Sequence, residues 1–174
     1  MGNTASATVS DAAGNVSVSS PVFILNIDAT APSIAANITI TDDVSPVTGL
    51  LSKEGFTNDN TPTLNGTAEA NAFVTIYNGA NALGTVQADG NGLWNFTPSA
   101  LADDTYTFST TVSDAAGNVS GRSPDFKLTI DTKAPAAIGT LTVTHTVDPV
   151  SGTLNTNDSR PIISGTADKN TTIT

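Results

Sequence analysis

The chain has 174 residues, of which 16 are acidic and 6 basic, so its formal net charge is −10 and its pI is near 4.1. This balance argues against nucleic acid or an anionic membrane surface as a partner, because both demand clustered Lys and Arg. The sequence contains no cysteine, which excludes disulfides, thiolate metal sites and a cysteine nucleophile.

The first recognisable element is the decapeptide TVSDAAGNVS, which occurs at residues 8–17 and again at 111–120. Extending the match outward places SSPVFILNIDATAP over RSPDFKLTIDTKAP, and SPVTG over DPVSG. After a four-residue difference in loop length, TNDNTPTLNGTAE lies over TNDSRPIISGTAD. The repeating unit is therefore about 100 residues long, the size of an immunoglobulin-like sandwich domain.

This repeat divides the chain into one complete module and two partial ones. Residues 32–131 form the complete module. We interpret residues 1–31 as the last two strands, F and G, of a preceding copy. Residues 132–174 are interpreted as strands A and B and the start of strand C of the next copy.

Within the complete module, apolar residues recur with a period of two, which predicts β-strands rather than helices. Gly/Asn turn signals such as NGAN, ADGNG and DAAGN separate the runs at hairpin spacing. The pattern predicts an all-β fold, a seven-strand antiparallel immunoglobulin-like sandwich repeated in tandem. Seven strands, lettered A to G in chain order, are expected at 37–41, 61–68, 73–77, 82–88, 93–97, 105–112 and 126–130. Residues expected to face inward include Phe108, Val112, Phe126, Leu128 and Ile130.

Three large aromatic residues have specific expected places. Trp94 and Phe96 share one face of their strand and are expected in the core. Tyr106 lies at the start of the sixth strand, where a tyrosine corner is found in this type of sandwich.

The run GTAEANAFVTIYNGANALGTVQADGNGLWNFTP, together with LADDTYTFSTTVSDAAGNVS and LTIDTKAP, resembles a bacterial immunoglobulin-like repeat. Such repeats form the extender regions of giant type I-secreted adhesins and biofilm-associated surface proteins. The resemblance covers nearly the whole chain. It implies a non-enzymatic cell-adhesion protein at the extracellular bacterial surface, with neighbouring repeats as partners and calcium at or near the joints.

Acidic residues are expected to gather at both ends of the sandwich. The B–C, D–E and F–G loops share the N-terminal end with the incoming linker, so Asp28, Glu69 and Asp114 are expected to converge there. Asp89 lies at the same end but is better explained as a hairpin turn residue. At the other end, Asp131 is expected to face Asp168 of the next copy.

Two further sets of carboxylates complete the candidate metal ligands. Asp103 or Asp104, in the E–F loop, could join Asp131 at its joint. The long A–B connection brings together Asp42, Asp43 and Asp59, which predicts a site inside the module. In the next copy His145 and Thr146 replace the first two of these, while Asp158 keeps the place of the third.

Unit charges about 4 Å apart repel by roughly 4 kcal/mol at an effective dielectric constant of 20. Lys and Arg are too few to neutralise each joint, and Ca²⁺ accepts six to eight oxygen ligands, so calcium is the predicted cofactor. Each carboxylate could instead be solvated or accept only turn hydrogen bonds, as Asp114 would in an Asx turn.

Other functions have weaker signals. A carbohydrate-binding or accessory sandwich is the alternative, and it would need exposed aromatic side chains, for which only Tyr77, Trp94 and Tyr106 were candidates. His145 is the sole histidine and has no Ser/Asp partners in sequence, so no catalytic site is predicted. Membrane insertion is not expected, because no apolar run approaches about 20 residues. The unpaired strands of the partial modules could pair head to tail between molecules.

Overall fold

A computed structural model describes residues 3–138, 142–144, 160, 162–169 and 171–173 of the chain. The described residues form strands and turns, with no helix among them, in two compact units, residues 1–132 and 133–174.

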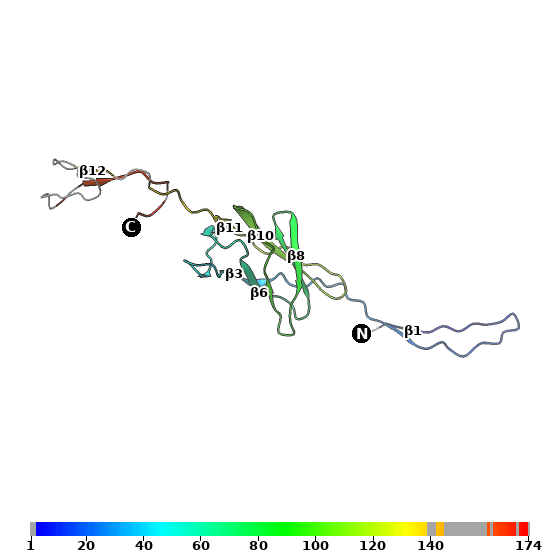
Figure 1. Cartoon of the computed structure of the whole chain (residues 1–174). Coiled ribbons are helices and arrows are strands. Elements are labelled where there is room, and N and C mark those ends of the chain that lie inside the picture. Colours follow the sequence, from blue (N-terminus) through cyan, green and yellow to red (C-terminus); the bar gives the residue numbers. More distant parts are fainter. Residues whose placement is uncertain (1–2, 139–141, 145–159, 161, 170, 174) are drawn as a thin grey trace. The chain divides into compact units, whose positions relative to one another are not determined.

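Residues 32–132 fold into a sandwich of two β-sheets (Figure 1). In spatial order, the five-stranded sheet contains β5 (Gly55–Thr57), β11 (Phe126–Ile130), β10 (Asp104–Ser113), β7 (Phe73–Asn78) and β8 (Asn81–Gln87). The four-stranded sheet contains β4 (Gly49–Leu50), β3 (Ala36–Asp42), β6 (Thr63–Thr67) and β9 (Leu93–Phe96). The predicted all-β immunoglobulin-like fold is confirmed, and a strand lies at each of the seven predicted places.

The connection between β3 and β6 differs from the prediction. It contains two additional short strands, β4 and β5. β5 pairs in parallel with β11, in the register Gly55↔Leu128 to Thr57↔Ile130, so an antiparallel arrangement is wrong for this pair. The chain leaves one sheet after β3 and joins the edge of the other, running in the same direction as β11. A three-residue strand is too short to show alternation in the sequence.

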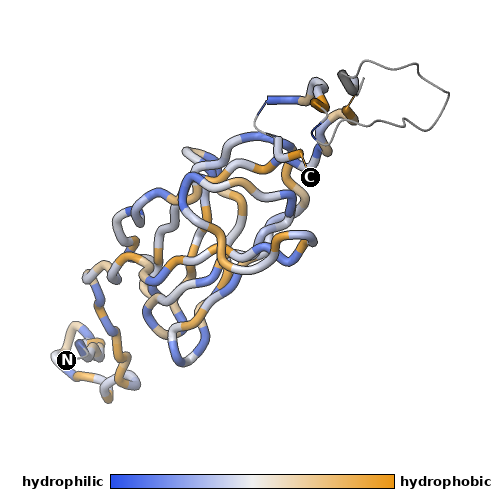
Figure 2. Tube along the Cα trace, turned by 90° about the vertical axis from the view of Figure 1, so that its left-hand side faces the viewer, coloured by the Kyte–Doolittle hydropathy of each residue, from blue (hydrophilic) through white to orange (hydrophobic). Residues whose placement is uncertain are grey.

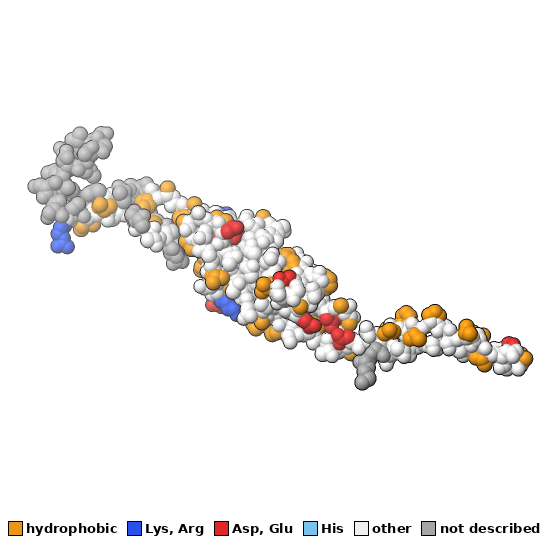
Figure 3. Space-filling view, turned by 90° about the horizontal axis from the view of Figure 1, so that it is seen from below, with side chains coloured by type: hydrophobic (Ala, Val, Ile, Leu, Met, Phe, Trp, Pro, Cys, Tyr) orange, Lys and Arg blue, Asp and Glu red, His pale blue; other side chains and the backbone are white. Residues whose placement is uncertain are grey.

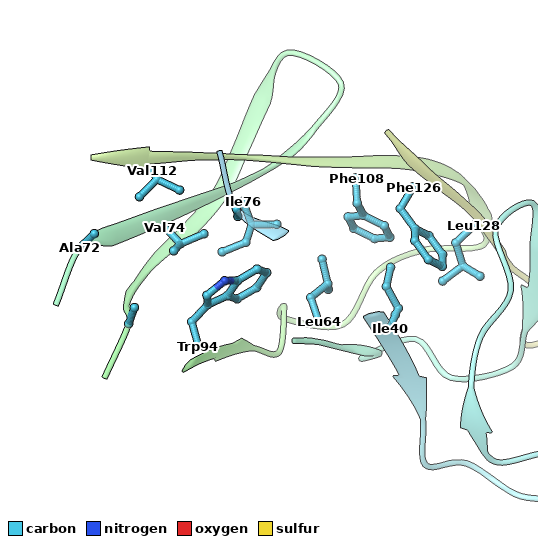
Figure 4. Close-up of a cluster of buried hydrophobic side chains, with 12 residues drawn as sticks. Ile40, Leu64, Ala72, Val74, Ile76, Trp94, Phe108, Val112, Phe126 and Leu128 are labelled. Atoms are coloured by element: carbon cyan, nitrogen blue, oxygen red, sulfur yellow. The ribbon is translucent and has the colours of Figure 1, made fainter. Parts of the chain in front are cut away.

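The core lies between the two sheets, and hydropathy alternates along the strands (Figure 2). The side chains predicted to face inward are buried, except for Phe96, which is only partly buried, and the Trp94 ring lies among them (Figure 4). A Cβ atom on Gly66 would lie 2.5 Å from Cζ2 of Trp94, so the ring needs a glycine on the neighbouring strand. The most deeply buried apolar side chains are those of Ile40, Leu64, Val74, Ile76, Phe108, Val112, Leu128 and Ile130.

The predicted tyrosine corner is confirmed. The hydroxyl of Tyr106 donates a hydrogen bond to the backbone oxygen of Ala102 at 3.0 Å. The Tyr106 ring also stacks on that of Phe108, with ring centroids 5.8 Å apart. The corner therefore holds the loop before β10 against the core.

Threonine pairs line the outer faces of both sheets. Hydroxyl groups meet across neighbouring strands at 2.7 Å for Thr63–Thr97, 2.9 Å for Thr75–Thr85 and 3.0 Å for Thr105–Thr129. Such cross-strand pairs stabilise a sheet by roughly 0.2–1 kcal/mol each. They explain how the module keeps stable outer faces with few charged residues.

The N-terminal hairpin pairs its strands as the complete module does. Its strands are β1 (Asn3–Ala5) and β2 (Phe23–Leu25), and Asn3↔Leu25 corresponds in the repeat to Tyr106↔Leu128 of β10 and β11. Its apolar side chains are uncovered, because Phe23 is 67% exposed whereas the equivalent Phe126 is 6% exposed.

The second unit contains a hairpin of β12 (Thr142–Thr144) and β13 (Ile162–Ser164). Its register, Thr142↔Ser164, corresponds in the repeat to Thr39↔Asn65 of β3 and β6. Both hairpins therefore pair at positions equivalent to strand pairs of the complete module, and their assignment as partial copies stays a prediction.

Candidate metal sites at the ends of the sandwich

The chain enters and leaves the sandwich at opposite ends of β10. At one end, Nδ2 of Asn118 in the F–G turn donates to the backbone oxygen of Asp28 in the incoming linker, at 3.1 Å. At the other end, the backbone N–H of Thr132 donates to Oδ1 of Asp103 at 3.0 Å. β10 has 10 residues, and at 3.3–3.4 Å per residue it separates the two ends by about 33 Å.

At the incoming end, three predicted carboxylates surround one open pocket. Asp28, Glu69 and Asp114 line this pocket of about 410 Å³, together with the alanine and asparagine residues of the same loops. Acidic side chains are visibly gathered at one end of the sandwich (Figure 3). The linker and the B–C and F–G loops therefore each contribute one carboxylate to a shared concave surface.

Asp114 organises the turn of the repeated decapeptide. Its Oδ1 accepts hydrogen bonds from the backbone N–H groups of Ala116 and Asn118, and its Oδ2 accepts one from Nδ2 of Asn118 at 2.8 Å. The Asn118 side-chain bond, followed by the backbone bonds, lowers the pKa of Asp114 below its ordinary value of 3.8. The predicted Asx turn is confirmed, and its carboxylate is ionised at neutral pH.

The same turn occurs in the N-terminal hairpin. Asp11 accepts hydrogen bonds from Ala13 and Asn15, and these bonds lower its pKa in the same way. Gly14 and Gly117 have φ angles of 89° and 91°, which a residue with a Cβ atom rarely adopts. The recurrence of the decapeptide is thus explained by a turn that needs both the aspartate and the glycine.

The incoming-end pocket offers the right type of donor for calcium but no preformed set. Among the described residues, no group of three or more His, Cys, Asp or Glu side chains is arranged to hold a metal ion. Asp28 uses Oδ1 to accept the N–H of Thr30 at 3.0 Å. Hard oxygen donors fit Ca²⁺, and ligation would require these side chains to draw closer together.

The second predicted group lies at the outgoing end and is largely buried. Asp42 is 4% exposed and Asp59 is 1% exposed, whereas Asp43 is exposed. Asp42 accepts the N–H of Val44 at 2.7 Å and the hydroxyl of Thr57.

Every carboxylate oxygen of Asp59 also has a donor. Oδ1 accepts the N–H and the hydroxyl of Thr61, and Oδ2 accepts the N–H of Asp43 at 3.4 Å. Hydrogen bonds alone therefore satisfy both buried side chains, and a metal at this group remains a prediction.

Thr57 is a member of this hydrogen-bonded group that the carboxylate pattern did not identify. Its hydroxyl donates to Asp42 and accepts the N–H of Asp59 at 3.0 Å, so it links the end of β3 to the end of β5. A signal was present in the sequence, because Thr-Asn-Asp occurs at 57–59 and again at 156–158.

Each of the remaining predicted ligands takes part in a hydrogen bond with a backbone group. The N–H of Asp131 donates to the oxygen of Thr57 at 2.9 Å, and Oδ1 of Asp104 accepts the N–H of Thr105 at 2.7 Å. Asp168 lies in the second unit, where its Oδ2 accepts the N–H of Ala136 at 2.7 Å. A shared site of Asp131 and Asp168 remains a prediction. His145, Thr146 and Asp158 lie outside the described residues.

Asp89 is a hairpin turn residue, as predicted. Its Oδ1 accepts the N–H groups of Asn91 and Leu93, each at 2.8 Å.

The three aromatic side chains that a carbohydrate-binding face would need all have contacts within the protein. The guanidinium of Arg122 lies 4.0 Å from the centroid of the Tyr77 ring and donates to Gly79 and Ser109. Trp94 is 3% exposed, and Tyr106 forms the corner described above. These three side chains therefore provide no free stacking platform.

The two-sheet architecture, the tyrosine corner and the position of the linkers define an immunoglobulin-like β-sandwich. A family model described as a bacterial Ig-like domain matches residues 33–132, and the chain belongs to this family. Such domains are typically non-enzymatic binding or structural modules and commonly occur in surface or extracellular proteins. A comparison with curated proteins gave no match. In the part of the chain that the structure describes, no helix is long and apolar enough to cross a bilayer.

Proposed function

We propose that this chain is a spacer segment of a bacterial cell-surface adhesin, which holds a distal adhesion domain away from the cell. The observation that carries the proposal is the placement of the incoming and outgoing linkers at opposite ends of β10. Modules joined in this way add length with each copy, about 33 Å per sandwich. The internal repeat supports a tandem arrangement.

We further propose that calcium stiffens the joints. At the incoming joint, Asp28, Glu69 and Asp114 would hold the ion; at the outgoing joint, Asp131 and Asp168 would, with Asp103 or Asp104. Asp42, Asp43 and Asp59 form the candidate site inside the module. When bound, the ion would supply the positive charge that allows carboxylates of the linker and loops to approach each other. The hydrogen bond from Asn118 to the linker already restrains this joint.

Millimolar calcium is expected to raise the melting temperature of the full chain relative to the same sample in chelator. At a concentration about ten times Kd, binding to the folded state alone stabilises it by about 1.4 kcal/mol, or roughly 5–10 °C for a module of this size. Thermal melts followed by circular dichroism measure this shift.

The double variant Asp28→Asn/Glu69→Gln should abolish the calcium shift. Asp89→Asn, a turn carboxylate outside the pocket, should keep it. Equal melting curves with calcium and chelator for the wild-type chain would contradict the calcium proposal. The spacer role would stand apart from this result, because it depends on the length that each module adds.

Head-to-tail association is the further partner interaction that we propose. Phe23, Ile24 and Leu25 of the N-terminal hairpin are each at least half exposed. In the complete module the corresponding face of β11 is covered by the opposite sheet. A second copy could cover the hairpin with the A–B hairpin of its own C-terminal segment, giving an open heterologous contact.

The average mass in sedimentation equilibrium is expected to rise with protein concentration for the wild-type chain and not for Phe23→Asn. Phe56→Asn removes a phenylalanine of similar exposure, 75% against 67%, from the sandwich and should leave the association unchanged. A monomeric mass for the wild-type chain at every concentration would exclude this interaction.

A further inference from the structure

Among the described strands, the pairing of β5 with β11 is the one parallel pairing, and it lies on the path of a pulling force. Tension applied through the two linkers acts along β10, since they attach at its opposite ends. β11 continues directly into the outgoing linker, and β3 follows directly from the incoming one. Force therefore draws β3 and β11 in opposite directions, parallel to their own axes.

Sliding along the strand axis loads all hydrogen bonds of a strand pair at once, whereas peeling from one end breaks them one at a time. β11 is held on both edges, by five pairs with β10 and three with β5. β3 is held by β6 through a ladder with a bulge between Ala36 and Thr39, and by the two-residue strand β4. The irregular ladder of β3 is thus the weaker of the two attachments.

If β3 slides off β6, tension passes through the connection to β5. The connection is anchored to β11 by the bond from the N–H of Glu54 to the oxygen of Lys127 at 2.7 Å. At the far end of β5, the N–H of Asp131 donates to the oxygen of Thr57 at 2.9 Å. β5 must then slide along β11 against both of these bonds and the ladder between them.

Once β5 has separated from β11, no other strand pair in the described sandwich resists the tension in the same sliding geometry. β6 begins at the outgoing end and runs back toward the incoming end, so tension on its first residue, Thr63, peels its ladder open from that end. The parallel pair is the last part of the fold that is loaded in sliding geometry.

The buried Asp42–Thr57 hydrogen bond connects the two resisting strands. It joins the last residue of β3 to the last residue of β5, and Asp59 accepts the N–H of Asp43 beside it. This arrangement lets β3 and β5 resist the pull together. It also gives the buried carboxylates of Asp42 and Asp59 a mechanical role, since hydrogen bonds already satisfy their oxygen atoms without a metal.

We propose that the β5–β11 pair, fastened to β3 through Asp42 and Thr57, is the load-bearing element that sets the force at which the module unfolds. The proposal goes beyond the spacer role. It concerns the mechanics of the sandwich itself and does not depend on calcium or on the location of the protein.

Single-molecule pulling of the full chain between marker domains, in chelator, tests the proposal. Unfolding of the module is recognised by a gain in length of roughly 300 Å, the extended length of about 100 residues less the folded length. Asp131→Pro removes the N–H that donates to the oxygen of Thr57 at 2.9 Å, at the end of the β5–β11 pair, and is expected to reduce the unfolding force to roughly half. Leu50→Pro places the same ring in β4, which pairs with β3 and lies outside the β5–β11 pair, and should leave the force unchanged.

A third variant covers the case in which Asp131→Pro fails to fold. Thr57→Val keeps the shape of the side chain but removes the hydroxyl that donates to Asp42, and it should also lower the unfolding force. Unfolding forces equal to wild type for Thr57→Val and for any folded Asp131→Pro protein, or an equal loss of force in Leu50→Pro, would overturn the proposal.

Discussion

Replacing Leu128 with alanine is expected to lower the free energy of unfolding of the sandwich by about 3 kcal/mol. The side chain of Leu128 is fully buried in the core, so its removal loses apolar burial and leaves a cavity. Leu25 occupies the same position of the repeat in the N-terminal hairpin and is 50% exposed. Leu25→Ala should therefore change the stability of the sandwich by less than about 0.5 kcal/mol.

Urea denaturation followed by Trp94 fluorescence measures both effects, because the indole lies in the core of the sandwich. The chain has one tryptophan, so the signal reports this module alone. Similar losses for the two leucine variants would contradict the assignment of residues 32–131 as the one module with a closed core.

Asp59→Ala is expected to destabilise the module by about 3 kcal/mol, because it removes a buried carboxylate and leaves the N–H groups of Thr61 and Asp43 without their acceptor. Asp43→Ala provides a matched control. It removes a neighbouring exposed carboxylate but keeps the backbone N–H that Asp59 accepts, so a change below about 0.5 kcal/mol is expected.

Chemical denaturation in chelator separates this structural role from metal binding. A loss that appears only in the presence of calcium would indicate that Asp59 acts as a ligand. A loss of equal size in calcium and chelator would indicate the hydrogen-bonded role described here.

Most of the fold could be predicted from the sequence because apolar residues recur with a period of two along its longer runs. The run FKLTI places Phe126, Leu128 and Ile130 inward, and all three are buried. The turn of the repeated decapeptide was equally clear, since an aspartate followed by Gly-Asn has a specific backbone geometry. In both cases local chemistry determines the structure without reference to distant residues.

The A–B connection could not be predicted in the same way. β5 is three residues long and obtains its place from pairing with β11, some 70 residues away in the chain. Phe56, in its centre, is 75% exposed. Its apolar side chain therefore does not mark a face that packs into the core, and the sequence gives no alternation signal for this strand.

The positions of the acidic residues could be predicted in part, whereas metal binding by them stays a prediction. Loop topology correctly brought Asp28, Glu69 and Asp114 to one pocket. The distances between their oxygen atoms depend on side-chain rotamers and on linker conformation, which alternation in the sequence does not encode. The burial of Asp42 and Asp59 likewise follows from the path of the A–B connection, which the sequence pattern did not reveal.

The most direct test of a calcium-stiffened spacer is the spread of distances across the incoming joint. The chain has no cysteine, so Ala12→Cys and Ala80→Cys place one spin label in the hairpin and one in the sandwich. Pulsed electron paramagnetic resonance should give a single narrow distance distribution in millimolar calcium and a broad one in chelator. Equally broad distributions under both conditions would contradict the account, since the joint would then bend freely whether or not the ion is present.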